Sequence, residues 1–114
     1  MQTVTVVLSV RTQHVDAFEA GFRDHELPVW RDLVSRGVML RASLTRLAIS
    51  TSPVEGAVQY LIAVDFATAE GHHEHDHHPG FEAWNRLADG YQVAEALAYG
   101  GDTILYLDET ARAM

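Results

Sequence analysis

A histidine-rich tract is the most unusual feature of the sequence and the first candidate for chemistry. Residues 71–80 read Gly-His-His-Glu-His-Asp-His-His-Pro-Gly. On a helix, His73 and His77 would share a face, so this pair could bracket one divalent transition metal ion such as zinc, copper, nickel or iron. In an extended loop, alternate histidines would share a face instead. The alternative without metal is a solvated, pH-sensitive segment, and residues 71–80 could form either a loop or a helix.

His25 is a second candidate for acid/base chemistry. It falls in an apolar helical stripe between Phe22 and Val29, shortly before Pro28. From this spacing we expect an inward-facing side chain, and a neutral imidazole in an apolar cavity can act as a general base or donate a hydrogen bond to a phenol or carbonyl. The alternative is a core histidine that bonds to a carbonyl freed by a kink at Pro28.

Aromatic and amide side chains could enclose a small molecule beside these histidines. Trp30 and Trp84 belong to apolar helical stripes, which favour either a pocket wall or ordinary core packing. Asn85 could orient a carbonyl oxygen or face solvent. The predicted pocket residues are Phe22, Trp30, Tyr60, Phe81, Trp84, Asn85 and Tyr91.

Hydrophobic periodicity predicts the elements that must position these groups. Strands are expected at residues 2–10, 38–50, 58–66 and 103–107, where apolar residues alternate or cluster. A bulge is expected near Thr45–Arg46, because the apolar residues on its two sides are out of phase. A helical stripe spans residues 14–36, with a break near His25–Leu27, and a second stripe ends at Tyr91.

The resulting order, β-α-β-β-α-β, is that of a ferredoxin-like α+β fold: a four-stranded antiparallel sheet with two helices on one face. A chain of 114 residues has room for one domain, spanning 1–114. The second face of the sheet is also apolar, and a second copy of the sheet would cover it, which favours a homodimer. The residues of this second face are Val7, Leu61, Ala63, Leu105 and Leu107.

Composition excludes several classes of function. Sixteen acidic residues against eight Lys and Arg give a net charge of −8, which disfavours nucleic acids and anionic membranes as partners. The chain has no cysteine, which rules out disulfides and thiolate sites and suits a cytoplasmic location. No apolar run approaches the roughly 20 residues of a membrane span, and the N-terminus is typical of a strand rather than a signal peptide.

The element order and the segment from Ala67 to Tyr91 resemble the dimeric α+β barrel superfamily, which includes antibiotic-biosynthesis monooxygenases and small polyketide cyclases. The stretch from His75 to Phe81 resembles the monooxygenase branch, where a histidine precedes a proline and an aromatic residue. His78, Phe81, Asn85 and Tyr91 together are similar to the cyclase branch. The region from Leu40 to Ile49 departs from that branch, because it lacks the aromatic and histidine residues of the second cyclase strand.

The resemblance implies a small cofactor-independent enzyme that acts on an aromatic or polyketide-like molecule. The expected acid/base groups are His25 and one residue of the histidine tract, His75 or His78. Oxygenation and aldol-type cyclisation are equally open, since both begin with proton removal and neither requires a bound cofactor. Two alternatives stand beside this hypothesis: a metal-dependent protein using the histidine tract, and a non-catalytic dimeric binding or stress-response module.

Overall fold

The strands and helices follow one another in the predicted β-α-β-β-α-β order, although each long helix is divided into shorter pieces. The computed structural model describes residues 1–108. The strands are β1 (Gln2–Arg11), β2 (Met39–Arg46), β3 (Ala57–Phe66) and β4 (Leu97–Asp102). The helices are α1 (Val15–Gly21), α2 (Leu27–Ser35), α3 (Gly71–Asp76) and α4 (Pro79–Asp89), with a 3-10 turn at Thr12–His14 and a π-helical turn at Phe22–Glu26.

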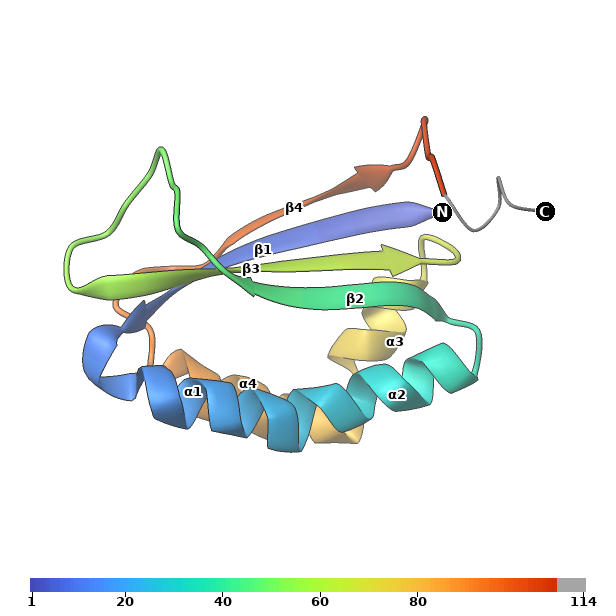
Figure 1. Cartoon of the computed structure of the whole chain (residues 1–114). Helices are drawn as coiled ribbons and strands as arrows, with labels where there is room; N and C mark the ends of the chain where they lie inside the picture. The colour runs from blue at the N-terminus through green and yellow to red at the C-terminus, as the bar shows by residue number, and fades with distance from the viewer. Residues whose placement is uncertain (109–114) are drawn as a thin grey trace.

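The four strands form one antiparallel sheet in the order β2-β3-β1-β4, and all four helices lie on one side of it (Figure 1). This arrangement confirms the predicted ferredoxin-like α+β fold. In the central pair, Val6 faces Ile62 and Leu8 faces Tyr60. Because side chains alternate across a strand, this register places the apolar residues of β1 and β3 together on the face that the helices cover.

The core fills the space between this inner face and the helices. Its fully buried large side chains come from α1, α2 and three strands, so the core joins both layers. They are Tyr60, Phe18, Phe66, Leu33, Met39, Val10 and Val29. Each such side chain stabilises the fold by about 1.5–3 kcal/mol relative to an exposed one.

The outer face of the sheet carries apolar residues without a covering helix (Figure 1). Val7 pairs with Leu61 on β3 and with Leu97 on β4, so these three side chains form a row across the sheet. Beside this row, Tyr99 is 64% exposed. We call the outer residues Val7, Leu61, Ala63, Leu97 and Tyr99 the open sheet face.

Two strand predictions are wrong in position. The last strand is Leu97–Asp102 rather than residues 103–107, because its pairing with β1 has already reached Gln2, opposite Asp102. Leu105 and Leu107 therefore follow the strand and are exposed. The irregularity in β2 lies between Met39 and Arg41 rather than near Thr45–Arg46.

Of the two conformations open to the histidine tract, loop or helix, the structure shows a helix over most of its length. Residues 71–76 form α3, and α4 begins separately at Pro79. The second helical stripe ends at Asp89, so Tyr91 lies beyond α4. Within residues 1–108, no helix is long and apolar enough to cross a membrane. The cytoplasmic location stays a prediction.

Gly21→Ala tests how closely α1 and α4 pack. A Cβ atom at position 21 would lie 2.5 Å from Cζ3 of the buried Trp84 ring, so the ring would have to move. Because 2.5 Å is well inside contact distance, we expect the clash to cost about 2–3 kcal/mol, the upper part of the range for overpacking. This cost exceeds the roughly 1 kcal/mol that alanine gains over glycine in a helix and leaves a net loss of about 1–2 kcal/mol in the free energy of unfolding. Urea unfolding measures this change.

Gly90→Ala is the matched control, because a Cβ atom there meets only an ordinary contact at 3.4 Å. Its stability should stay within about 0.5 kcal/mol of that of the wild type. Equal stability of Gly21→Ala and the wild type would contradict the close packing of Trp84.

Candidate functional site

A pocket of about 350 Å³ lies between the inner face of the sheet and the helices. Its floor is aliphatic and comes from β1 and β3, with Val6, Leu8 and Ile62 among its residues. Its walls are aromatic and come from the helices, and they are formed by Phe22, Trp30, Phe81 and Trp84. The volume and the apolar lining are typical of sites for small organic molecules.

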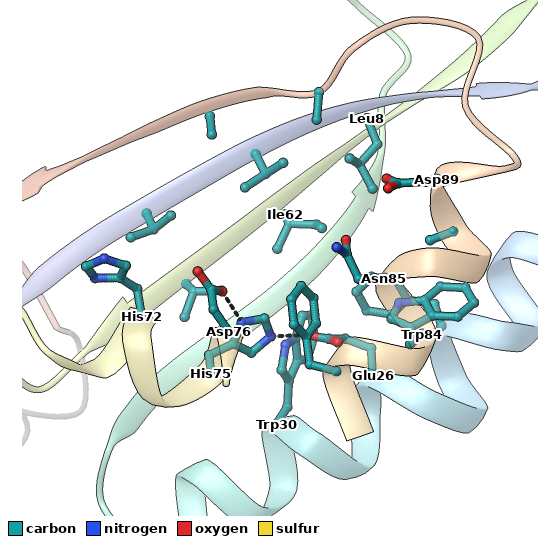
Figure 2. Close-up of a pocket in the computed structure, with 18 of the residues that line it drawn as sticks. Leu8, Glu26, Trp30, Ile62, His72, His75, Asp76, Trp84, Asn85 and Asp89 are labelled. Atoms are coloured by element: carbon teal, nitrogen blue, oxygen red, sulfur yellow. Dashed lines mark hydrogen bonds and ion pairs between the residues drawn. The ribbon is translucent and has the colours of Figure 1, made fainter. Parts of the chain in front are cut away.

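One cluster of ionisable groups faces this apolar space. His75 on α3 lies between two carboxylates: its Nε2 atom is 2.5 Å from Glu26 Oε1, and its Nδ1 atom is 3.0 Å from Asp76 Oδ1 (Figure 2). All three residues line the pocket. No Lys or Arg is among the lining residues, so the basic side chains of the pocket are the imidazoles of His75 and the partly buried His72.

The π-helical turn at Phe22–Glu26 brings Glu26 to this position. A π-turn adds a residue to the helical repeat, so side chains beyond it are rotated relative to a regular α-helix. Phe22 and Glu26 both become buried, while His25 between them is exposed. The expected inward position of His25 is therefore wrong: its ring stacks on the outside of Trp84, with 5.7 Å between the ring centroids, and it does not line the pocket.

The short helix α3 brings His75 to the same place. Gly71 at its start lies so close to Phe66 that a Cβ atom would come within 2.6 Å of the ring. The His75 ring also packs on Phe81, with 4.3 Å between the centroids. The imidazole is thus fixed by a ring on one side and by carboxylates at both nitrogens.

Burial makes the Glu26 carboxylate unusual. Glu26 is only 4% exposed, and its Oε1 atom contacts His75. Its second oxygen, Oε2, is buried and has no hydrogen-bond partner within the described part of the chain. Buried carboxylates are rare unless they are paired, so this residue is a strong indication of a functional site.

The surroundings of His75 raise its pKa above the ordinary value of 6.5. Burial by itself would lower the pKa of this imidazole, because it disfavours the charged form. The hydrogen bond and charge of Glu26, followed by those of Asp76, outweigh burial and raise the pKa. An imidazolium at this position can donate from both ring nitrogens, one hydrogen to each carboxylate.

The structure brings together many of the side chains predicted for the site. Six of them line one pocket, and five of these are pocket candidates from the sequence, while the sixth is the acid/base candidate His75. They are Phe22, Trp30, Phe81, Trp84, Asn85 and His75.

His78 lies outside the pocket and holds the start of α4 instead. Its Nδ1 atom accepts a hydrogen bond from the Gly80 N–H at 3.1 Å. Its Nε2 atom is 3.0 Å from Asp32 Oδ2 on α2. One ring nitrogen thus caps α4 and the other contacts α2, so His78 has a structural role in joining these two helices.

Two predicted pocket tyrosines also lie elsewhere. The Tyr60 hydroxyl donates to Glu19 at 2.5 Å, in a group that includes Arg46, on the far side of the Phe22 and Trp30 rings from the pocket. Burial and this carboxylate raise the pKa of Tyr60 to about 12. Tyr91 packs against His14, with 5.2 Å between the ring centroids.

His73 and His77 are exposed, with 6.3 Å between their ring centroids. Among residues 1–108, no three His, Asp or Glu side chains form a group that could hold a metal ion. The metal alternative stays a prediction.

Glu26 is a pocket residue that the sequence analysis missed, whereas His72 and Asp76 lie in the histidine-rich tract that it singled out. Glu26 had a readable signal: it stands four residues from both Phe22 and Trp30, so it continues an apolar stripe with a charged residue. A carboxylate in such a stripe is either turned to solvent by a change of helical phase or buried beside a partner that stabilises its charge.

No family model matches the chain, and no curated protein matches it. Solved structures do resemble it. One, a candidate antibiotic biosynthesis monooxygenase from Nitrosomonas europaea, has a TM-score of 0.74 at 12% identity, covering 92% of this chain and all of the other. Another antibiotic biosynthesis monooxygenase has a TM-score of 0.71 at 11% identity over the same shares of both chains.

A dimeric ferredoxin-like protein from an uncultured marine organism is similar to the same degree. Its TM-score is 0.71 at 7% identity, covering 96% of this chain and all of the other. At these identities the likeness is one of fold. The chain therefore has a ferredoxin-like fold, and in fold it resembles proteins named antibiotic biosynthesis monooxygenases and a protein named as a dimeric ferredoxin-like protein.

Proposed function

We propose that this protein is a small enzyme that removes a proton from an aromatic or polyketide-like molecule held in the pocket. The observation that carries the proposal is the buried contact between His75 and Glu26 at the wall of an otherwise apolar cavity. Acid/base groups enclosed by apolar side chains are typical of catalytic sites, because their proton affinity is set by each other rather than by water.

The pocket favours charge that forms during the reaction. Proton loss from a phenol or from an activated C–H group leaves an oxyanion, a phenolate or enolate. Once the Glu26–His75 pair has taken the proton, the Glu26 carboxylate is neutral. In a cavity that excludes water, the positive charge of a protonated His75 then stabilises the oxyanion more strongly than it would in solution. Aromatic walls from Trp30, Trp84 and Phe81 would hold a planar ring in place.

Two outcomes are open to such an anion without a bound cofactor. It can react with dioxygen, so that a CH₂ group and one O₂ become a carbonyl group and one water. It can also attack a carbonyl group of the same molecule and close a ring. The names of the structural neighbours favour the first outcome.

We also propose that the protein is a homodimer joined through the open sheet face. The row of Val7, Leu61 and Leu97 needs a cover, and a second copy of the same face supplies one by two-fold symmetry. Exposed Leu105 and Leu107, which follow β4, add apolar surface for such an interface. One of the structural neighbours is named as dimeric.

His75→Asn tests the catalytic proposal. Hydroxylated aromatic and polyketide-like compounds are first screened for those that raise the melting temperature, and the binders are then assayed for conversion and oxygen uptake. His75→Asn should lower kcat on the best substrate by about a hundredfold or more, since it removes a proton-transfer group.

His73→Asn is the matched control, because His73 is exposed and does not line the pocket. Its kcat should equal that of the wild type. A His75→Asn variant with wild-type kcat would contradict the role of His75, and a defect confined to His73→Asn and His77→Asn would favour the metal alternative.

The protonation of His75 should titrate above its ordinary range. In a pH titration followed by NMR, the His75 ring should have a midpoint above 6.5, and Glu26→Gln should lower that midpoint, because the main group that raises the pKa is lost while burial remains. A midpoint that Glu26→Gln leaves unchanged would contradict the pairing.

The same shift sets the pH dependence of stability. A group whose pKa is raised by folding stabilises the native state fully below its unfolded pKa, and this contribution disappears as pH rises through the folded pKa. Urea unfolding should therefore show that His75→Asn costs more stability at about pH 6 than at about pH 9.

Leu61→Glu tests the dimer. Charges at the centre of the open sheet face would repel each other in a symmetric pair, so sedimentation at micromolar concentration should show a monomer for this variant and twice the 12.6 kDa chain mass for the wild type. Leu87→Glu, at an exposed position on α4, should remain dimeric. A monomeric, folded wild type would overturn the proposed interface.

A further inference from the structure

The strongest unexplained feature of the pocket is the free oxygen of Glu26. Oε2 is buried in a residue that is 4% exposed, and no described residue hydrogen-bonds to it. A buried acceptor without a partner destabilises a protein, so such an atom usually has a functional reason. Glu26 lines the pocket, which makes the pocket's occupant the natural source of a donor.

His75 is poorly placed to contact a ligand directly through its nitrogens. Nε2 is directed to Glu26 and Nδ1 to Asp76, so both hydrogen-bonding positions of the ring are engaged (Figure 2). An imidazole has no third position for a hydrogen bond in its plane. A hydroxyl group of the ligand would therefore contact the Glu26 carboxylate rather than the His75 ring.

We propose that Glu26 Oε2 accepts the hydrogen of a hydroxyl group on the pocket ligand and thereby selects uncharged, hydroxylated aromatic molecules. This inference rests on the proposed function, since it assumes that the pocket binds an aromatic molecule. Glu26 would then be the group that meets the substrate, and His75 would be the residue that positions and charges it.

The charges around the pocket fit an uncharged ligand that donates a hydrogen bond. The lining residues include the carboxylates of Glu26, Asp76 and Asp89 and no Lys or Arg. A ligand carboxylate would be repelled by these groups, because the charge of His75 is already paired with Glu26 and Asp76 and no guanidinium or ammonium partner is present. A phenolic or enolic hydroxyl supplies the donor that Oε2 lacks without adding charge.

The same geometry provides a route for the proton. A proton received at Oε2 can be balanced by one that leaves His75 from Nδ1, because the imidazole contacts the other Glu26 oxygen through Nε2. Asp76 at Nδ1 has a side chain that is 54% exposed, whereas the His75 side chain is 15% exposed. The chain of contacts thus leads from the apolar pocket to solvent.

Binding of three matched probes tests the inference: naphthol, its methyl ether and naphthoate. The ether keeps the rings and the oxygen but cannot donate, and naphthoate carries a negative charge. Both tryptophans of the chain line the pocket, so the NMR signals of their indole N–H groups report binding directly. The wild type should bind naphthol about tenfold or more tightly than the ether, and naphthoate more weakly than naphthol.

Glu26→Leu should reduce the advantage of naphthol over its ether to less than about threefold, because no acceptor remains at this position. Glu26→Gln keeps an uncharged amide acceptor and should reduce the advantage in part. Asp24→Asn is the matched control, since it removes an exposed carboxylate from the same π-turn and should leave the advantage intact. Should Glu26→Leu fail to fold, Glu26→Gln and the wild-type comparison of the two probes still decide the question.

The results separate this inference from the proposed function. Equal affinity for naphthol and its ether in the wild type would overturn the role of Oε2. It would not contradict the proposal that the pocket binds aromatic molecules. An undiminished advantage in folded Glu26→Gln or Glu26→Leu would overturn it as well, as would a preference for naphthoate. Failure of all three probes to shift either indole signal would overturn the pocket itself and the proposed function with it.

Discussion

A carboxylate that cannot reach water must be paired, and the Glu26–His75 contact meets that requirement in this protein. The contact joins the π-turn after α1 to the short helix α3, two segments separated by 49 positions in the sequence. It also sets the charge of the pocket wall, because the pKa of His75 depends on Glu26. Phe81 packs against the same His75 ring, so the pair also borders the aromatic wall of the pocket.

The π-turn is the local device that makes the pairing possible. A regular α-helix from Val15 to Ser35 would keep one continuous apolar stripe facing the sheet. The wider turn at Phe22–Glu26 changes the phase, so Glu26 is turned inward and His25 outward. Since π-turns are less stable than regular helix, their occurrence at a ligand-sized cavity agrees with the association of such turns with functional sites.

The fold was predictable from the sequence because alternation and helical stripes report burial directly, as in β1 and β3. The position of β4 was not, because its Leu-Ala-Tyr-Gly-Gly-Asp sequence has weak strand character and its pairing is decided by β1. For the site, the aromatic wall and His75 were readable from composition and spacing. The spacing of Glu26 from Phe22 and Trp30 indicated burial, but its pairing with His75 depends on contacts between distant segments, which no local pattern encodes. The same is true of the helix-joining role of His78.

The brevity of α3 has a consequence for how the pocket behaves in time. A helix of six residues does not persist by itself in water, so α3 is maintained by its attachments: Gly71 against Phe66, and His75 against Glu26 and Phe81. Local opening of a protein begins where such attachments are few. One wall of the cavity therefore rests on a segment whose stability comes from a small number of side-chain contacts rather than from the helix itself.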